Sequence, residues 1–192
     1  MTMERAEILA WRKKKRDELI AARMAMPHAA HAEADAVIAR RIDTCLDEIE
    51  PCLVGAYWPF RREFNVLPVL DGLMAQGFTI ALPVVLGKGR PLEFRPWTRA
   101  TKLASGVYDI PYPAEGEAVR PKVLIVPLVG FDDDGYRLGY GGGFYDRTLE
   151  AMEPRPFCLG VGFELSHLPT IHPLPHDIPM NAIATELSFY VR

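Results

Sequence analysis

The chain has 192 residues, of which 49% are hydrophobic and 24% are charged, and its formal net charge is −3. This length suits a single globular domain with a sizeable core, and the balance of residue types argues against a disordered chain. The slight negative charge argues against binding to bulk nucleic acid or to an anionic membrane surface. No apolar stretch approaches the roughly 18 residues of a membrane-spanning helix.

The cysteines bear on the compartment in which the protein works. Cys45, Cys52 and Cys158 are odd in number, and their spacing matches neither a CxxC metal site nor a disulfide framework. The first residues lack the apolar region of a signal peptide. We therefore expect a reduced, cytoplasmic protein.

Hydrophobic spacing and helix-breaking residues divide the first half of the chain into five elements. In chain order they are a helix over 4–26, a helix over 28–49, a strand over 53–58, a helix over 65–76 and a strand over 78–85. The first helix is expected to pack on apolar residues at helical spacing, namely Ile8, Trp11, Leu19 and Ala22. The apolar stripe of the second helix is Ile38, Ile42, Cys45 and Ile49. Asn65 is expected to cap the third helix.

The second half is expected to begin with an edge strand over 92–95 and a Pro- and Gly-rich loop over 99–121. Next come a buried strand over 123–129, a helix over 143–152, a strand over 157–163 and short strands over 183–186 and 189–191. Strands that alternate with helices predict an α/β fold. We expect a three-layer α/β/α sandwich with a mostly parallel central sheet, in one domain over residues 1–192.

Four glycines, Gly139, Gly141, Gly142 and Gly143, lie between an apolar strand and a helix. They match neither a Walker A loop nor the dinucleotide-binding pattern. Small residues at such a junction can turn backbone N–H groups toward a phosphate, although a tight strand-to-helix turn explains the glycines equally well. The flanking Arg137, Tyr145 and Asp146 favour a phosphate site with a metal beside it.

Arg12, Arg16 and Arg23 are spaced by 4 and 7 residues on the first predicted helix. They fall within about 40° of one another around the helix axis. Such a stripe suits a polyanion such as ATP, but a solvated face of a basic amphipathic helix explains most runs of this kind. Lys13 and its two neighbouring lysines spread around the circumference, as solvated residues do.

Carboxylates supply the other candidate site residues. Asp177 could provide an oxygen ligand to Mg²⁺ or could cap its loop. Glu63 follows Trp58 just past the end of a predicted strand, where open α/β sheets place their ligands. It could hydrogen-bond a pterin-like ring or pair with a neighbouring arginine. The run Asp132-Asp133-Asp134-Gly135 lacks the remaining ligands of a calcium loop and is interpreted as a polar turn.

Two kinds of site are not indicated. His172 and His176 lie on a proline-broken loop with poor geometry for zinc, and no third soft ligand is obvious. No Ser/His/Asp or Cys/His arrangement for a protein nucleophile is visible.

The run Arg137-Leu-Gly-Tyr-Gly-Gly-Gly-Phe-Tyr-Asp146 closely resembles the signature of the 5-formyltetrahydrofolate cyclo-ligases, also called methenyltetrahydrofolate synthetases. The likeness covers essentially the whole chain and includes the basic N-terminal helix, the run that ends at Glu63 and the segment His-Asp-Ile-Pro that contains Asp177. The resemblance implies ATP- and Mg²⁺-dependent cyclisation of 5-formyltetrahydrofolate to 5,10-methenyltetrahydrofolate, with release of ADP and phosphate. The substrates would be small molecules, and we expect a monomer or weak homodimer.

The resemblance also implies site residues. Those that would contact ATP are Arg12, Lys13, Arg16, Arg137, Gly139, Tyr140, Gly141, Gly142, Gly143, Phe144 and Tyr145. Those that would contact the folate are Trp58, Glu63, Tyr140 and Phe144. Asp146 and Asp177 would hold the magnesium, and Arg137 and Tyr145 would be catalytic.

The chain departs from the family pattern at four positions. Gly142 replaces a frequent Lys, Tyr140 an occasional Arg, Tyr112 a usual Glu and Asn181 a common Asp. Losing one charged contact to phosphate could weaken ATP binding about 10- to 100-fold, which Arg12, Arg16 and Arg137 could offset. Two other hypotheses therefore stay open: a non-catalytic folate- or nucleotide-binding protein on the same fold, and a sugar-phosphate isomerase on a similar sheet.

Overall fold

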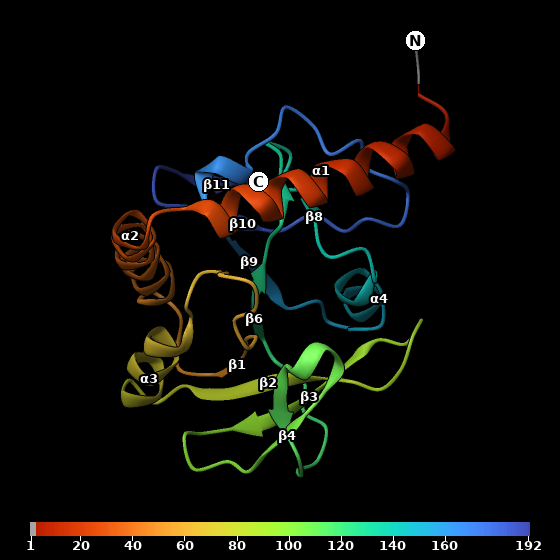
Figure 1. The fold of residues 1–192 in the computed structure, drawn as a ribbon. Helices are drawn as coiled ribbons and strands as arrows, with labels where there is room; N and C mark the ends of the chain where they lie inside the picture. Colours follow the sequence, from red (N-terminus) through yellow and green to blue (C-terminus); the bar gives the residue numbers. More distant parts are fainter. Residues whose placement is uncertain (1–2) are drawn as a thin grey trace.

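A seven-stranded sheet lies at the centre of the protein in the computed structural model, which describes residues 3–192 (Figure 1). Its strands follow the order β11-β10-β9-β6-β1-β2-β3. The strands from β10 to β2 run parallel, whereas the edge strands β11 and β3 run antiparallel to their neighbours. They are β1 (Leu53–Gly55), β2 (Thr79–Val85), β3 (Leu92–Trp97), β6 (Val123–Pro127), β9 (Phe157–Val161), β10 (Ala182–Ala184) and β11 (Phe189–Val191). The prediction of a mostly parallel sheet is confirmed.

The α-helices within residues 3–192 are α1 (Arg5–Ala25), α2 (His28–Leu46), α3 (Leu67–Ala75) and α4 (Phe144–Glu150). Helices α2 and α3 cover one face of the sheet, where Ile38 and Leu70 share a buried cluster with Ile125. Helix α4 covers the other face, where Leu149 packs with Leu124. Successive side chains of β6 thus point to opposite layers, as the period of two in a strand requires. The predicted α/β/α arrangement is confirmed.

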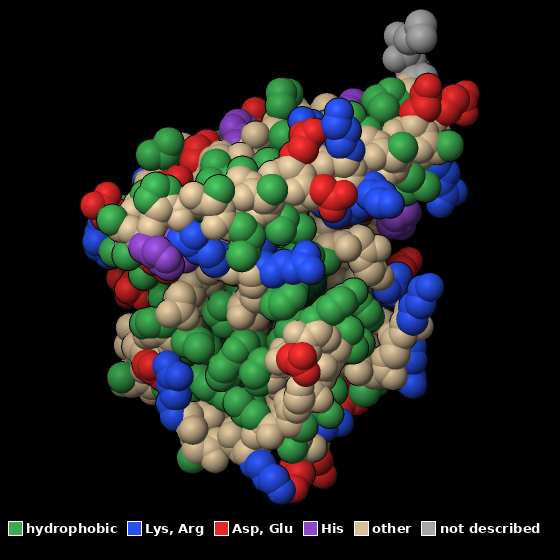
Figure 2. Space-filling view, viewed as in Figure 1, with side chains coloured by type: hydrophobic (Ala, Val, Ile, Leu, Met, Phe, Trp, Pro, Cys, Tyr) green, Lys and Arg blue, Asp and Glu red, His purple; other side chains and the backbone are tan. Residues whose placement is uncertain are grey.

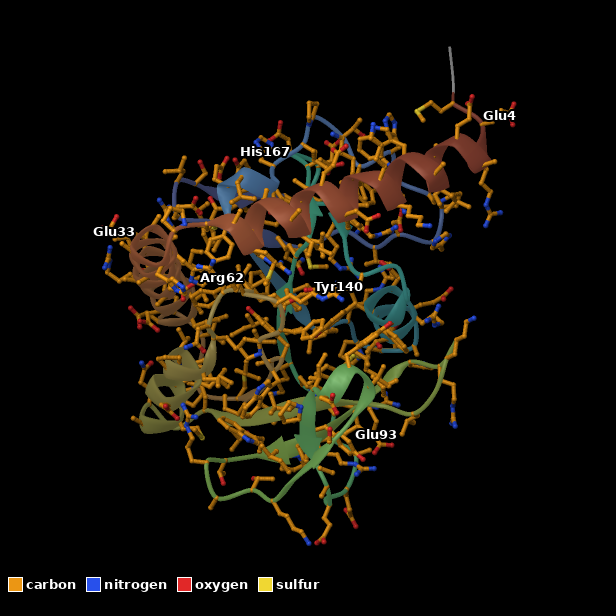
Figure 3. The ribbon with its side chains drawn as sticks, viewed as in Figure 1. Glu4, Glu33, Arg62, Glu93, Tyr140 and His167 are labelled. Carbon is orange, nitrogen blue, oxygen red and sulfur yellow. The ribbon has the colours of Figure 1, made fainter. Side chains whose placement is uncertain are left out.

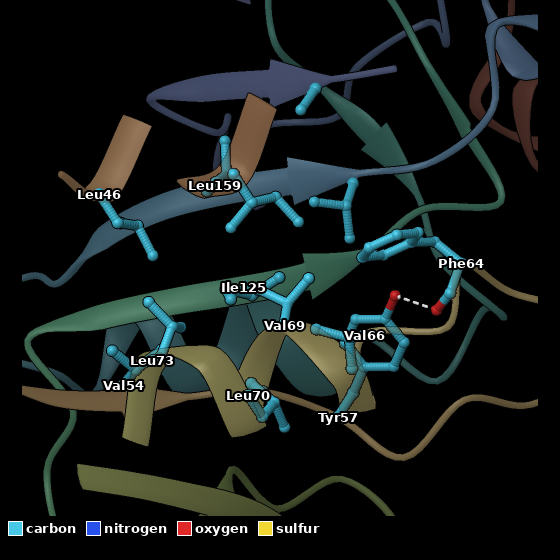
Figure 4. Close-up of a cluster of buried hydrophobic side chains, with 14 of the residues drawn as sticks. Leu46, Val54, Tyr57, Phe64, Val66, Val69, Leu70, Leu73, Ile125 and Leu159 are labelled. Atoms are coloured by element: carbon cyan, nitrogen blue, oxygen red, sulfur yellow. Dashed lines mark hydrogen bonds between the residues drawn. The ribbon is translucent and has the colours of Figure 1, made fainter. Parts of the chain in front are cut away.

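The larger cluster, shown in Figure 4, reaches from α2 through the sheet to the loop after β1. Tyr57 lies in this cluster and donates a hydrogen bond from its hydroxyl to the carbonyl oxygen of Phe64, at 2.9 Å. A buried phenol needs such a partner because an unpaired polar group in an apolar core costs free energy. The bond also joins the two ends of the loop that carries Glu63.

Helix α1 packs only in part as predicted. Its buried residues are Arg12 and Arg23, whereas Ala22 is exposed and Trp11 and Leu19 are only half-buried. The helix crosses above the sheet, beside β8 (Arg137–Leu138) and β10 in Figure 1. There Arg12 and Arg23 donate to loop carbonyl groups. Trp11 and Leu19 pack, as expected, against a small buried cluster of Leu138, Leu168 and Ile171.

The loop expected over 99–121 contains a small hairpin of β4 (Leu103–Ser105) and β5 (Pro111–Pro113), joined by the turn η1 (Val107–Asp109). The strand expected over 123–129 ends at Pro127, and a second hairpin follows, made of β7 (Gly130–Phe131) and β8 (Arg137–Leu138). Short, paired strands of this kind carry too few residues to show a period of two.

Two smaller expectations can be compared directly. The N-cap of α3 is Val66 rather than Asn65, although Asn65 Oδ1 accepts a long hydrogen bond of 3.4 Å from Leu67 N. The run that ends at Gly135 is a turn, closed by Gly135 N donating to Asp132 O at 3.0 Å. None of the helices within residues 3–192 combines the length and apolar character needed to cross a bilayer.

Candidate functional site

The strand order places a topological switch between β1 and β6. From β1 the chain continues to β2 on one side, and from β6 it continues to β9 on the other. Loops at the carboxyl ends of two such strands diverge and leave a crevice, which is where open α/β sheets bind ligands. The loop after β1 carries Trp58 and Glu63, and the hairpin after β6 leads to the glycine loop, residues 139–143.

Arg23 of α1 joins these two loops. Its Nε donates to Arg61 O at 3.0 Å, past β1, and its Nη1 donates to Leu128 O at 3.1 Å, just past β6. Its Nη2 donates to the hydroxyl of Tyr140 at 2.6 Å. Arg23 therefore belongs to the site, although sequence reasoning noted it only as part of a stripe on the helix.

Tyr140 links Arg23 to Glu63 through hydrogen bonds. The tyrosine hydroxyl donates to Glu63 Oε1 at 2.9 Å, and the backbone N–H of Phe60 donates to Glu63 Oε2 at 2.9 Å. Glu63 is only 5% exposed, whereas Tyr140 is 42% exposed. Figure 3 shows Tyr140 below α1, in the middle of this face of the protein.

Burial governs the charge of this cluster. It raises the pKa of Glu63 to about 7, against the opposing effects of Arg23, the Phe60 N–H and the Tyr140 hydroxyl. Burial and the nearby Glu63 carboxylate also raise the pKa of Tyr140 and of Tyr145. Both phenols therefore stay protonated at neutral pH and can act as hydrogen-bond donors.

Aromatic rings surround the carboxylate. The ring of Phe60 lies 5.9 Å from that of Tyr140 and stacks on that of Tyr108, with centroids 6.0 Å apart. Trp58 meets Trp97 edge to face at 6.4 Å. Figure 2 shows hydrophobic side chains gathered on the face below α1, with basic side chains along the border of the helix. Phe60 and Tyr108 were missed from the sequence because single aromatic residues in loops carry no pattern.

The glycine loop follows β8 and ends at the start of α4. Gly141 and Gly143 have positive φ values of 92° and 62°, which other residues adopt only with strain. Gly139 O accepts a hydrogen bond of 2.7 Å from Arg16 Nε. A Cβ atom on Gly142 would lie 2.6 Å from the ring of Phe144, so this ring occupies the space where a side chain at position 142 would begin.

Arg16 is the arginine of the stripe that faces the glycine loop. Its guanidinium is half-buried, and burial together with the charge of Arg12 lowers its pKa from the ordinary arginine value. Neither Nη1 nor Nη2 hydrogen-bonds to any part of the chain that the structure describes. Two donor groups therefore remain available beside the loop.

Arg12 and Lys13 lie differently from the expected ATP contacts. Arg12 Nε donates to Ile171 O at 3.0 Å and Nη2 to His172 O at 2.9 Å, and its guanidinium forms a buried ion pair with Asp177. Lys13 is exposed and forms no ion pair with another of residues 3–192. The structure thus brings only Arg16 and Arg23 of the basic helix to the loops of the site.

The Arg137 side chain is buried and is not exposed on the surface of the glycine loop. Its Nη1 donates to Ile178 O at 2.6 Å and its Nη2 to Asp146 Oδ1 at 3.0 Å. Its guanidinium also lies 5.9 Å from the centre of the Tyr145 ring. These contacts fix β8 against the first turn of α4, which makes Arg137 a positioning residue in this geometry.

The two aspartates proposed for the metal have different surroundings. Asp146 Oδ1 accepts from Arg137 and from Ile178 N at 3.1 Å, while no donor within residues 3–192 reaches its Oδ2. Both carboxylate oxygens of Asp177 accept hydrogen bonds from Arg12, and Oδ2 also accepts from Leu174 N at 2.6 Å. No three His, Cys, Asp or Glu side chains among the described residues are grouped to hold a metal. Because Mg²⁺ takes one or two carboxylates besides phosphate and water, Asp146 suits it and Asp177 does not.

Arg147, which follows Asp146, was not singled out from the sequence. Its guanidinium contacts Gly142 O and lies over the ring of Phe144, 5.5 Å from the ring centre. A separate groove of about 250 Å³ lies between β3 and α4, lined in part by Leu92 and Met152. None of its lining residues belongs to the predicted site.

Comparisons with known proteins bear on the family of this chain. A family model described as the 5-formyltetrahydrofolate cyclo-ligase family matches residues 8–186. The 5-formyltetrahydrofolate cyclo-ligase of Mycolicibacterium smegmatis is 34% identical over 143 residues, which cover 69% of this chain and 72% of that protein.

Two solved structures have the same fold. The NMR structure of 5,10-methenyltetrahydrofolate synthetase from Aquifex aeolicus matches with a TM-score of 0.81 at 23% identity, covering 94% of this chain and 92% of the other. The 5,10-methenyltetrahydrofolate synthetase of Mycoplasma pneumoniae matches with a TM-score of 0.76 at 20% identity, covering 91% and 98%. The sequence signature, the fold and the match over nearly the whole chain lead to one conclusion: this chain belongs to the 5-formyltetrahydrofolate cyclo-ligase family of ligases.

Proposed function

We propose that this protein uses ATP and Mg²⁺ to cyclise 5-formyltetrahydrofolate to 5,10-methenyltetrahydrofolate, with release of ADP and phosphate. The observation that carries the proposal is the link through Tyr140. This residue belongs to the glycine loop, and its hydroxyl bonds to Glu63 at 2.9 Å. A nucleotide on the loop and a folate ring at Glu63 would therefore be neighbours, as phosphoryl transfer between them requires.

The reaction has to remove an oxygen from an amide. The formyl oxygen is a very poor leaving group, so it first takes the γ-phosphoryl group of ATP, and ADP leaves. The folate nitrogen at position 10 then attacks the formyl carbon and gives up its proton. Breaking the carbon–oxygen bond releases phosphate and completes the ring. Since the nucleophile belongs to the substrate, the protein needs no nucleophilic side chain of its own.

The folate would bind among the rings around Glu63. The carboxylate would accept hydrogen bonds from N–H groups of the pterin, because a carboxylate oxygen can accept more than one donor. Trp58, Tyr140 and Phe144 would contact the ring, and Phe60 and Tyr108 extend the aromatic surface. Rings of this kind bind a flat heterocycle by stacking.

The triphosphate would lie along the glycine loop. Amides of Gly139, Gly141, Gly142 and Gly143 would donate to phosphate oxygens. The free Nη groups of Arg16 would add charge-assisted hydrogen bonds, and the protonated Tyr145 could donate as well. Arg137 would act by holding the loop against α4. Arg12 would act by fixing α1, and exposed Lys13 would at most contribute long-range charge.

Asp146 would hold the magnesium through its Oδ2, together with phosphate oxygens and water. When bound, Mg²⁺ would neutralise charge on the transferring phosphoryl group. The pairing of Asp177 with Arg12 argues against this role for Asp177. The free state of Cys45, Cys52 and Cys158 supports a cytoplasmic protein, which we propose to be a monomer or weak homodimer.

A turnover assay tests the proposal. The purified protein is mixed with 5-formyltetrahydrofolate, ATP and Mg²⁺, and the near-ultraviolet absorbance of the methenyl product is followed. The proposal predicts product formation that needs ATP and releases equal amounts of ADP. Saturating substrates without product would refute it, and tight folate or ATP binding without turnover would identify the chain as a binding protein.

A further inference from the structure

One hydroxyl group separates two buried charges in the crevice. The Tyr140 hydroxyl accepts from Arg23 Nη2 at 2.6 Å and donates to Glu63 Oε1 at 2.9 Å. Arg23 is 2% exposed and Glu63 is 5% exposed, so neither charge is well solvated. Each charge therefore depends on this hydroxyl for part of its compensation.

Tyr140 is also the residue that anchors the glycine loop. Its neighbours on both sides are glycines, and residues 139–143 contain no other side chain. Glycines lack a Cβ atom and so restrict the backbone less than other residues do, and Gly141 and Gly143 have positive φ values. Arg16 Nε holds Gly139 O and Arg147 holds Gly142 O from outside the loop, whereas the Tyr140 hydroxyl is the contact that ties the loop to Glu63.

We propose that Tyr140 couples the two substrates, so that each binds more tightly when the other is present. This inference rests on the proposed function, with nucleotide on the glycine loop and folate at Glu63. A nucleotide that orders the loop places the Tyr140 hydroxyl on Glu63. A folate whose N–H groups bind Glu63 favours the ionised carboxylate, which is the form that accepts from the Tyr140 hydroxyl. The free-energy cost of ordering the loop is then incurred by the first ligand and not again by the second, which makes the coupling positive.

The charge of Glu63 supports this direction. The groups that face it are Arg23 from α1, Tyr140 from the glycine loop, the Phe60 N–H, and the phenols of Tyr57 and Tyr145. Burial raises the pKa of Glu63 to about 7, so near neutral pH the carboxyl is only partly ionised without ligand. Donors from a folate ring favour the ionised form, and the ionised form is the stronger acceptor for the tyrosine hydroxyl.

Calorimetry on the full chain tests the coupling. The Kd of 5-formyltetrahydrofolate is measured with and without a non-hydrolysable ATP analogue and Mg²⁺, and the reciprocal titration must give the same ratio. The wild type should show a ratio of about tenfold, the range expected for one hydrogen bond to a charged group. Tyr140→Phe should bring the ratio close to one, with each Kd measured alone changing less.

Two further variants sharpen the result. Tyr136→Phe removes a hydroxyl that makes no hydrogen bond within residues 3–192, and it should keep the wild-type ratio. Glu63→Gln keeps the shape but removes the anion, and it should lose the ratio as Tyr140→Phe does. A wild-type ratio of one, or a full ratio in Tyr140→Phe, overturns the coupling while leaving the proposed function intact. Failure of the wild type to bind folate at all would instead contradict the proposed function.

Discussion

Arg12 and Asp177 form a buried ion pair that joins α1 to the loop over residues 171–177. Burial alone would raise the pKa of Asp177, but the hydrogen bonds from Arg12 and from Leu174 N outweigh it and lower the pKa below its ordinary value. A carboxylate with a lowered pKa stabilises the fold above its unfolded-state pKa of 3.8, and that contribution is lost as the pH falls through the lower, folded-state value. The pair therefore supports the fold at neutral pH.

Asp177→Asn should lower the free energy of unfolding by about 3 kcal/mol, because it leaves Arg12 buried without its counter-ion. Denaturant titration measures this, with the exposed Asp134→Asn as the control. The concentration of Mg²⁺ needed for half-maximal activity should not change. A marked rise in that Mg²⁺ concentration, with an unchanged free energy of unfolding, would instead support Asp177 as a metal ligand.

Asp146→Asn should behave in the opposite way towards magnesium. Its free Oδ2 is the oxygen that we assign to the metal, so the concentration of Mg²⁺ for half-maximal activity should rise about tenfold or more. Activity should recover in part at excess Mg²⁺. Because the amide can still accept from Arg137, the unfolding free energy should change less than in Asp177→Asn. Wild-type dependence on Mg²⁺ would remove the assignment.

Arg16→Ala should raise the KM for ATP roughly tenfold and leave the KM for folate close to that of the wild type, because a charge-assisted hydrogen bond to phosphate contributes about 1.5–3 kcal/mol. The matched control is Lys13→Ala, which removes an exposed cation of the same helix and should leave both constants nearly unchanged. Initial-rate kinetics at saturating levels of the other substrate measure the constants. An equal rise in both constants for Arg16→Ala would count against a specific phosphate contact.

Folate binding should weaken as the pH falls through about 7, the pKa to which burial raises Glu63. The anion accepts the ring N–H groups, so binding at pH 6 should be roughly tenfold weaker than on the plateau above pH 8. Stability should move the other way. A raised pKa favours the protonated carboxyl in the folded state, and this contribution is full below the ordinary value of 4.5 and lost above about 7.

Glu63→Gln is the control for this pH dependence. It should bind folate weakly and without the step near pH 7, whereas a step that persists in the variant would assign the titration to another group. Calorimetric titrations with folate across roughly pH 5.5 to 8.5 separate the two outcomes.

The sequence predicted the sheet and its two helical layers because those elements repeat a physical pattern. Burial on both faces of the sheet makes β6 and β9 continuous apolar runs. Burial on one face of α2 places Ile38 and Ile42 at helical spacing. The strand–glycine–helix order also predicted the junction between β8 and α4, whose binding of phosphate stays a prediction. The position of Glu63 past β1 followed from the general rule for open sheets.

Contacts between distant segments were not predictable in this way. Nothing in the pattern of α1 indicates that Arg12 pairs with Asp177 while Arg16 faces the loop, because both lie on one stripe. The link from Arg23 to Tyr140 depends on how the helix crosses the sheet. The sequence marked Gly142 as lacking a family lysine, and only the structure shows the ring of Phe144 in that space.

A crystal structure with a non-hydrolysable ATP analogue, Mg²⁺ and 5-formyltetrahydrofolate tests the central claim most directly. We predict that the phosphates lie on residues 139–143 beside Arg16, with the metal on Asp146 and the pterin ring at Glu63. The γ-phosphate should point at the formyl oxygen. Nucleotide density far from the glycine loop, or a folate ring away from Glu63, would contradict the account.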